Sequence, residues 1–252
     1  MNVSLGKQRA DLTPRRFRPR HLRPDEHDRS CDYEHMTKAA SPTRSRILES
    51  GINLLSTSGL AGVTLGTLAE RTGMSKSGLF AHFKSKEEVQ LQLLEHTARI
   101  AGEMVVAPSM RAPEGLPRFR ALVRNWLGWT AKAGLAGGCP VAAGIFELDD
   151  VDGPVRELLL ELEKSWRALL GQNVSRAMEL GHLRADLDVE QFIWELCGIY
   201  LSHHASLRFV RDPKADKYAR VAFEALLERA LPKPATRKTG RSEPSHRIQR
   251  SR

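Results

Sequence analysis

Helix start and stop signals follow one another along most of this chain, and no stretch shows the sustained apolar–polar alternation of a β-strand. Serine, threonine or aspartate, the preferred N-cap residues, precede segments whose apolar residues recur every three or four positions. Glycine closes several of these segments, as at Gly59, Gly73 and Gly181. The sequence therefore predicts an all-α fold and argues against sheet-based architectures.

The first half of the chain predicts three helices followed by a longer one. The first starts near residue 41, and the second and third follow the N-cap residues Thr64 and Ser75. Ser85 and Glu88 have the spacing of a capping box, which begins the longer helix. Two short helices around a glycine-containing turn, with a helix before them, have the layout of a helix-turn-helix motif. Apolar residues on their inner faces are expected to hold the motif together: Leu68, Ala69, Met74, Leu79 and Phe83.

Residues 44–89 resemble the DNA-binding domain of the tetracycline-repressor (TetR/AcrR-like) family of transcriptional regulators. The resemblance lies in two runs, 63–69 (VTLGTLA) and 73–89 (GMSKSGLFAHFKSKEEV), which have the family's spacing. It implies an N-terminal three-helix helix-turn-helix domain and a C-terminal helical domain for ligand binding and dimerisation. It also implies a regulator rather than an enzyme, with no cofactor and no metal.

The resemblance further implies which side chains meet DNA. These are Thr64, Ser75, Lys76, Ser77, His82 and Lys86. Those at helix N-termini would contact backbone phosphates, where the helix dipole favours an anion, and those at the start of the third helix would face a major groove. The alternative for each is an exposed polar residue with no partner. One departure is Phe80, because the family usually has Tyr there and its hydroxyl often meets a phosphate.

The second half of the chain is also helical in pattern. Three prolines within 105–117 predict a connection there, and a short apolar segment lies at 141–146. Helices are expected over 116–133, 154–180, 188–212 and 213–231. These patterns place the DNA-binding domain at 41–88 and the effector-binding and dimerisation domain at 89–231.

The last two helices are more apolar than one buried face requires, which suits the family's homodimer. A homodimer would also place two recognition helices on a palindromic DNA operator. Between its helices the family holds a small-molecule effector, and the aromatic composition here suits a flat or bulky apolar one. The candidate lining residues, which could equally fill a helical core, are Phe119, Trp126, Trp129, Phe146, Trp166, Met178, Trp194 and Tyr200.

The net charge of +9 lies in the terminal segments, with +3 in residues 1–40 and +6 in 232–252. Both segments lack helical periodicity and are predicted to be disordered, as basic arms that attract polyanions or as solvated tails. Met36 directly precedes the first helical segment, so translation starting there is a further hypothesis. No apolar run is long enough to span a membrane and no signal-peptide pattern is present, so a cytoplasmic protein without membrane partners is expected.

Two other functions stay open at this point. The first is an enzyme on the C-terminal helices that uses Cys139 or the adjacent His203 and His204, although no nucleophile–base motif supports it. Neighbouring helical residues point about 100° apart, so the two histidines cannot hold one metal ion together. Cys139 could also sense redox state, but no basic neighbour in the sequence would activate its thiol. The second is a DNA-binding activator that needs no ligand.

Overall fold

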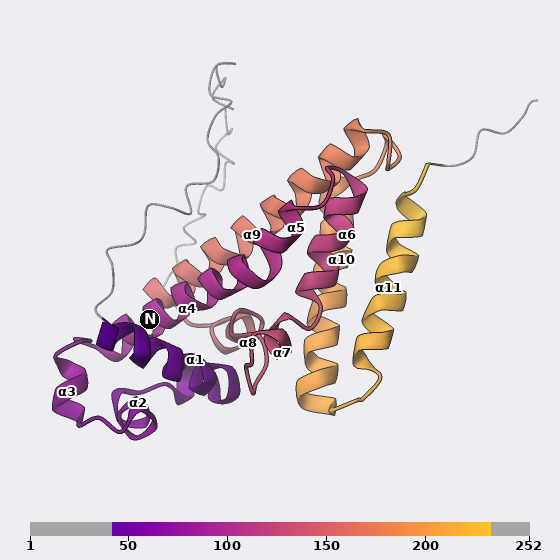
Figure 1. Cartoon of the computed structure of the whole chain (residues 1–252). Coiled ribbons are helices and arrows are strands. Elements are labelled where there is room, and N and C mark those ends of the chain that lie inside the picture. Colours follow the sequence, from indigo (N-terminus) through magenta and orange to yellow (C-terminus); the bar gives the residue numbers. More distant parts are fainter. Residues whose placement is uncertain (1–41, 233–252) are drawn as a thin grey trace, which may run out of the picture. The chain divides into compact units, whose positions relative to one another are not determined.

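The computed structural model describes residues 42–232, and all regular structure within that range is helical, as predicted (Figure 1). The predictions for the two terminal tails, except at residue 232, and for a translation start at Met36 lie outside these residues. The elements in chain order, with η for a π-helical turn, are α1 (Pro42–Gly62), α2 (Leu65–Thr72), α3 (Lys76–Phe80), α4 (Lys86–Ala101), η1 (Gly102–Val106), α5 (Ala107–Met110), α6 (Leu116–Trp126), α7 (Trp129–Lys132), α8 (Pro140–Glu147), α9 (Pro154–Glu179), α10 (Val189–Ala205), η2 (Ser206–Val210) and α11 (Ala215–Ala230).

Helices α1 to α4 enclose the first of two hydrophobic cores. Leu68, Leu79, Phe83 and Val89 are completely buried in it, and Leu159 of α9 joins them. Burying a side chain of this size stabilises the fold by about 1.5–3 kcal/mol, so these buried residues hold the short helices α2 and α3 in place. The predicted inner faces of the helix-turn-helix are therefore confirmed, with Met74 partly buried at their edge.

The second core lies among α6, α9, α10 and α11. Its centre contains Phe119, Leu170, Leu196 and Leu227, each at most 1% exposed. Figure 1 shows α4 and α9 running side by side, and α10 and α11 forming an antiparallel pair. The two cores are thus joined by long helices that pass from one to the other.

Two predicted boundaries in the middle of the chain were wrong. The predicted helix over 116–133 is broken, because Gly128 takes a left-handed φ of 79° between α6 and α7. The predicted connection over 105–117 is mostly helical, because α4 continues through the π-helical turn η1 into α5. Pro108 lies in the first turn of α5, where a missing N–H costs little.

The termini of the last helices follow the predicted signals more closely. Asp188 caps α10 by accepting a hydrogen bond from Gln191 N at 3.0 Å. The helix then widens into η2 and stops at Arg211, whose left-handed φ of 59° ends the pattern, before α11 begins at Ala215. No helix among residues 42–232 is long and apolar enough to cross a membrane.

Candidate nucleic-acid interface

The start of α2 is fixed by a capping box around Thr64. Its hydroxyl accepts a hydrogen bond from Thr67 N at 3.1 Å, and Thr67 Oγ1 accepts one from Thr64 N at 2.9 Å. Gly73 ends the helix in the left-handed conformation, with φ 66°. These caps fix the residues at which α2 begins and ends, so the turn to α3 has a defined geometry.

Helix α3 exposes the side chains that the sequence assigns to a DNA groove. Ser75 caps it by accepting a hydrogen bond from Gly78 N at 3.0 Å, and its hydroxyl lies 3.0 Å from that of Ser77. Ser75, Lys76 and Ser77 are all exposed, whereas Leu79 on the opposite side is completely buried. The regular helix ends at Phe80, and half-buried His82 follows in a turn.

The predicted capping box at the start of α4 forms only in part. Ser85 Oγ accepts from Glu88 N at 3.0 Å, but the Glu88 carboxylate accepts from Lys84 N at 2.8 Å instead of Ser85 N. This backbone hydrogen bond, together with Arg44, holds the pKa of Glu88 below its usual value. Lys86 is exposed, and its ammonium group reaches back to Ala61 O at 3.5 Å, three residues before Thr64.

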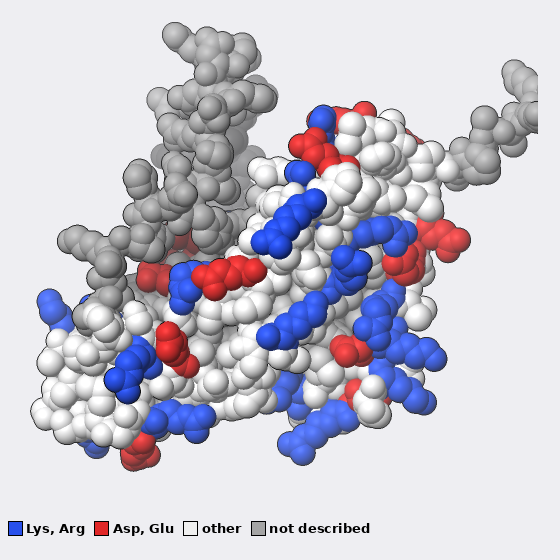
Figure 2. Space-filling view, viewed as in Figure 1, with Lys and Arg blue, Asp and Glu red and all other residues white. Residues whose placement is uncertain are grey.

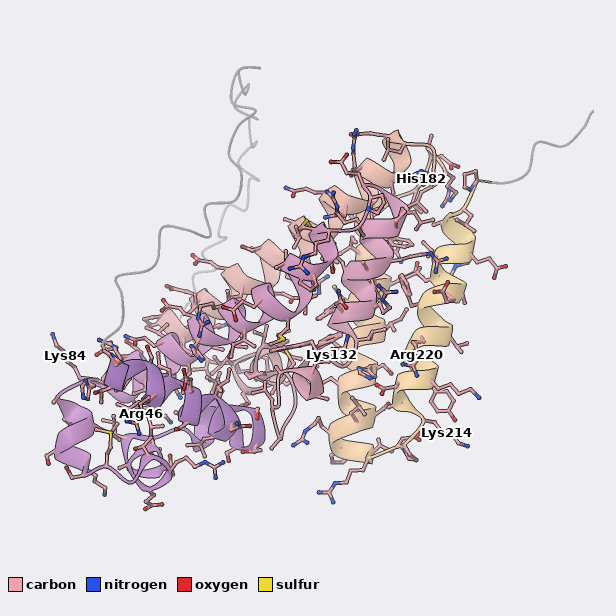
Figure 3. The ribbon with its side chains drawn as sticks, viewed as in Figure 1. Arg46, Lys84, Lys132, His182, Lys214 and Arg220 are labelled. Atoms are coloured by element: carbon pink, nitrogen blue, oxygen red, sulfur yellow. The ribbon has the colours of Figure 1, made fainter. Side chains whose placement is uncertain are left out.

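The surface around α2 and α3 carries few charges in the view of Figure 2, whereas Lys and Arg gather over the lower half of α10 and α11. Figure 3 places Lys84 at the α3 end of the helix-turn-helix and Lys132 on α7, away from α2 and α3. The candidate interface therefore combines the exposed hydroxyls of Ser75 and Ser77 with the exposed ammonium groups of Lys76 and Lys86.

Four of the candidate effector residues form one aromatic cluster in the second core. The ring of Trp126 stacks on Tyr200 with centroids 4.0 Å apart and meets Trp166 edge-on at 5.0 Å. The indole N–H of Trp129 donates to the Tyr200 hydroxyl at 2.9 Å. Burial raises the pKa of Tyr200 well above its ordinary value, so the hydroxyl stays protonated. This group, Trp126, Trp129, Trp166 and Tyr200, is called the aromatic cluster below.

The remaining effector candidates lie elsewhere. Phe119 is completely buried between Phe192 and Phe223, with centroid distances of 5.8 and 6.1 Å, and Met178 packs against the same core. Phe146 and Trp194 are 61% and 67% exposed, so they do not belong to the aromatic cluster. The apolar period of a helix predicts which face is buried, but α8 is too short for that period to be decisive.

Two of the side chains considered for catalysis, Cys139 and His203, are buried. Cys139 is buried, and desolvation raises the pKa of its thiol, which disfavours the reactive thiolate. His203 is buried too and pairs with Asp216 at 2.7 Å. Across residues 42–232, no three His, Cys, Asp or Glu side chains come together in a way that could hold a metal ion.

An open groove of about 520 Å³ runs between α10 and α11. Small residues make up much of its lining, together with the aromatic side chains of Trp194 and Tyr218. The lining includes Gly198, Ala215, Ala219, Ala222 and Ala225. Because glycine and alanine side chains are small, a groove lined by them allows another pair of helices to approach closely.

Sequence reasoning missed a set of contacts between α1 and the loop before α8. Asn53 and Ser56 of α1 bind the backbone N–H groups of residues 136–138. The adjacent glycines at 137 and 138 were the available signal, because a glycine pair often marks a close approach of backbone.

This geometry defines a helix-turn-helix regulator with an all-helical C-terminal part, and the comparisons agree. The family model of the tetR bacterial regulatory proteins matches residues 47–93, and that of the tetracyclin repressor-like C-terminal domain matches 115–223. The chain belongs to the TetR family of DNA-binding transcriptional regulators.

Three similar proteins illustrate the relationship. The HTH-type transcriptional repressor DhaR of Mycobacterium sp. (strain GP1) is 23% identical over 190 residues, covering 75% of this chain and 94% of DhaR. The structure of a TetR-family regulator from Cytophaga hutchinsonii has a TM-score of 0.69 at 20% identity, covering 79% of this chain and 99% of that one. AibR, solved with isovaleryl coenzyme A and operator DNA, has a TM-score of 0.57 at 19% identity, covering 71% and 94%.

Proposed function

We propose that this protein is a ligand-responsive repressor that binds a palindromic operator as a homodimer and is released by a small apolar or aromatic effector. The observation that carries the proposal is the exposed Ser75-Lys76-Ser77 face of α3, supported from behind by Leu79. Such a face enters a major groove, while Thr64, His82 and Lys86 would contact flanking phosphates. The similarity to the repressor DhaR supports the sign of regulation.

The homodimer is supported by the groove between α10 and α11. One recognition helix contacts too few base pairs for tight binding, whereas two related by a two-fold axis read both halves of a palindrome. In this proposal residues 41–88 bind DNA and residues 89–231 bind the effector and the partner subunit. An Ala222→Glu variant, with a charge at the lining of the groove, should sediment as a monomer, and Val221→Glu, at a 61% exposed neighbour, should stay dimeric.

The effector site is proposed at the aromatic cluster. The cluster supplies flat apolar surface and, at Tyr200 and Trp129, a few polar groups, which is the usual composition of a small-molecule site. Naphthalene and indole are minimal probes of this chemistry. Either should raise the melting temperature of the wild-type protein, and Trp126→Ala should lose the response.

DNA binding is tested first, with a duplex selected by the wild-type protein from a random pool and followed by fluorescence anisotropy. The Lys76→Ala/Lys86→Ala variant should bind it much more weakly, while Lys132→Ala removes a similar charge away from α2 and α3 and should bind normally. If binding is electrostatic at phosphates, affinity should also fall steeply with salt. Unchanged binding by the double variant, or selection of no duplex, would contradict the proposal.

A regulator that needs no ligand is the second candidate. The 4.0 Å stack of Trp126 on Tyr200 favours it, because stacked rings leave no room for a third ring between them. Failure of both aromatic probes to change melting or DNA affinity, with the duplex still bound, would support this candidate over the ligand-responsive one.

A further inference from the structure

The loop of residues 135–138, between α7 and α8, has α1 on one side and the end of α10 on the other. Three consecutive N–H groups of this loop bind α1: Ala136 N donates to Asn53 Oδ1 at 3.0 Å, Gly137 N to Ser56 Oγ at 3.2 Å, and Gly138 N to Ser56 O at 3.1 Å. Gly59, three residues after Ser56, is a non-helical residue inside α1, with φ 68°.

The backbone of the loop at Gly137 packs directly against the backbone of α1 at Ser56. A Cβ atom on Gly137 would lie 1.8 Å from Ser56 O and 2.1 Å from Ser56 C. Real Cβ atoms do not come so near a backbone carbonyl, so any other residue at position 137 must push the loop away from α1. The contact is therefore specified by a glycine and by two polar side chains of the helix.

The other side of the loop contacts the C-terminal end of α10 and the turn η2. A Cβ on Gly138 would lie 2.5 Å from His204 Cε1 of α10 and 2.9 Å from Arg208 Cγ of η2. The Arg208 guanidinium also donates to Ala136 O at 3.5 Å. A shift of this end of α10 toward or away from the loop would therefore change the contacts that His204 and Arg208 make with residues 136–138.

Both ends of the loop are anchored in the second core. Leu135 is buried there, and Cys139, directly after the loop, places its thiol beside the Tyr200 hydroxyl and the Trp129 indole. On the far side, α1 is packed tightly on the rest of the DNA-binding helices. A Cβ on its Gly51 would be 2.9 Å from Leu93 and 3.1 Å from Leu68.

From this continuous set of contacts we infer that the 135–138 loop is the link through which α10 and the aromatic cluster act on the position of α1, and hence of α2 and α3. The inference rests on the proposed function and names how its two sites are coupled. Coupling between two binding sites is reciprocal, so operator binding must also change the loop and α10. This allows a test that needs no effector.

The test is hydrogen–deuterium exchange of the full-length protein, with and without a saturating amount of the selected duplex. In the wild type, duplex should slow exchange in peptides covering 134–142 and the second half of α10 by about fivefold, the lower end of typical coupling. In the Asn53→Ala/Ser56→Ala variant the duplex should still bind, but the slowing in α10 should be lost. Gly137→Ala, which displaces the loop by steric contact alone, should give the same result.

Thr57→Ala is the matched control. Like Ser56, Thr57 donates its hydroxyl to Asn53 O at 2.9 Å, but its side chain is exposed and makes no hydrogen bond to the loop. It should keep the wild-type response. An unchanged α10 response in the Asn53→Ala/Ser56→Ala variant, or no α10 response in the wild type, would overturn the inference while leaving DNA binding intact. Selection of no duplex would instead overturn the proposed function.

Discussion

Phe80 offers a gain-of-function test of how α3 meets DNA. It is the last residue of α3 and is 54% exposed on the surface that we assign to the operator. The family usually has tyrosine at this position, with its hydroxyl on a phosphate. Phe80→Tyr therefore adds one hydrogen-bond donor per protomer on this surface.

The size of the gain follows from the exposure. The new hydroxyl stands in water in the free protein, so exchanging water for a phosphate oxygen should give a net gain of about 0.5–1.5 kcal/mol. A dimer makes the contact twice, which doubles the gain to about 1–3 kcal/mol. Because about 1.4 kcal/mol is a tenfold change in affinity, the variant should bind its duplex about 5- to 140-fold more tightly.

Fluorescence anisotropy at several salt concentrations measures both consequences. The dissociation constant should fall, while the slope of log affinity against log salt should stay the same, because a neutral hydroxyl releases no counterions. Phe209→Tyr adds the same group at an 89% exposed position outside the DNA-binding helices and should change nothing. Equal affinity of Phe80→Tyr and wild type, or an equal gain in Phe209→Tyr, would refute the assigned orientation of α3.

Three further predictions concern the cores. Leu79→Ala, at a completely buried position behind α3, should lower the free energy of unfolding by about 2–5 kcal/mol in urea titrations, and a loss below 1 kcal/mol would contradict the packing described here. Tyr200→Phe should cost about 1–3 kcal/mol, because it leaves the buried N–H of Trp129 without its acceptor; in the Trp129→Phe background the same change should cost measurably less. Burial lowers the pKa of His96 and His204, so the unfolded chain binds more protons and thermal stability should fall as the pH drops below about 6.5; a melting temperature that rises over that range would oppose this sign.

The helix-turn-helix could be predicted in detail because its determinants are local. The cap of Thr64 acts on Thr67, that of Ser75 on Gly78, and a glycine at position 73 ends the helix between them. Such interactions span three or four residues and depend little on the rest of the fold. The predicted stop of the first helix at Gly59 was less exact, because α1 continues past this non-helical residue to Gly62.

Side-chain assignments in the second core were less secure because they depend on which helices pack together. Trp126 and Tyr200, 74 positions apart in the chain, were rightly taken as inward-facing, and the structure stacks them. Trp194 is equally apolar and lies on the same helix as Tyr200, yet it faces the open groove. A helix that is apolar on more than one side gives no signal in its own sequence for which side faces the core and which faces a second chain.

The contact of the 135–138 loop with α1 lies furthest from what a single sequence can predict. Ser56 and Gly137 are 81 residues apart, and neither position follows a helical period that would announce the partner. The glycine pair indicates a close approach but not its target, because a missing Cβ accommodates any neighbour equally well. Once the target is known, the same pair becomes informative: Gly137 faces backbone of α1 and Gly138 faces side chains of α10 and η2, so two adjacent glycines serve two different helices. A substitution at position 137 should therefore displace the loop from α1, because a backbone carbonyl cannot yield, whereas one at position 138 should cost less, because the side chains of His204 and Arg208 can move aside.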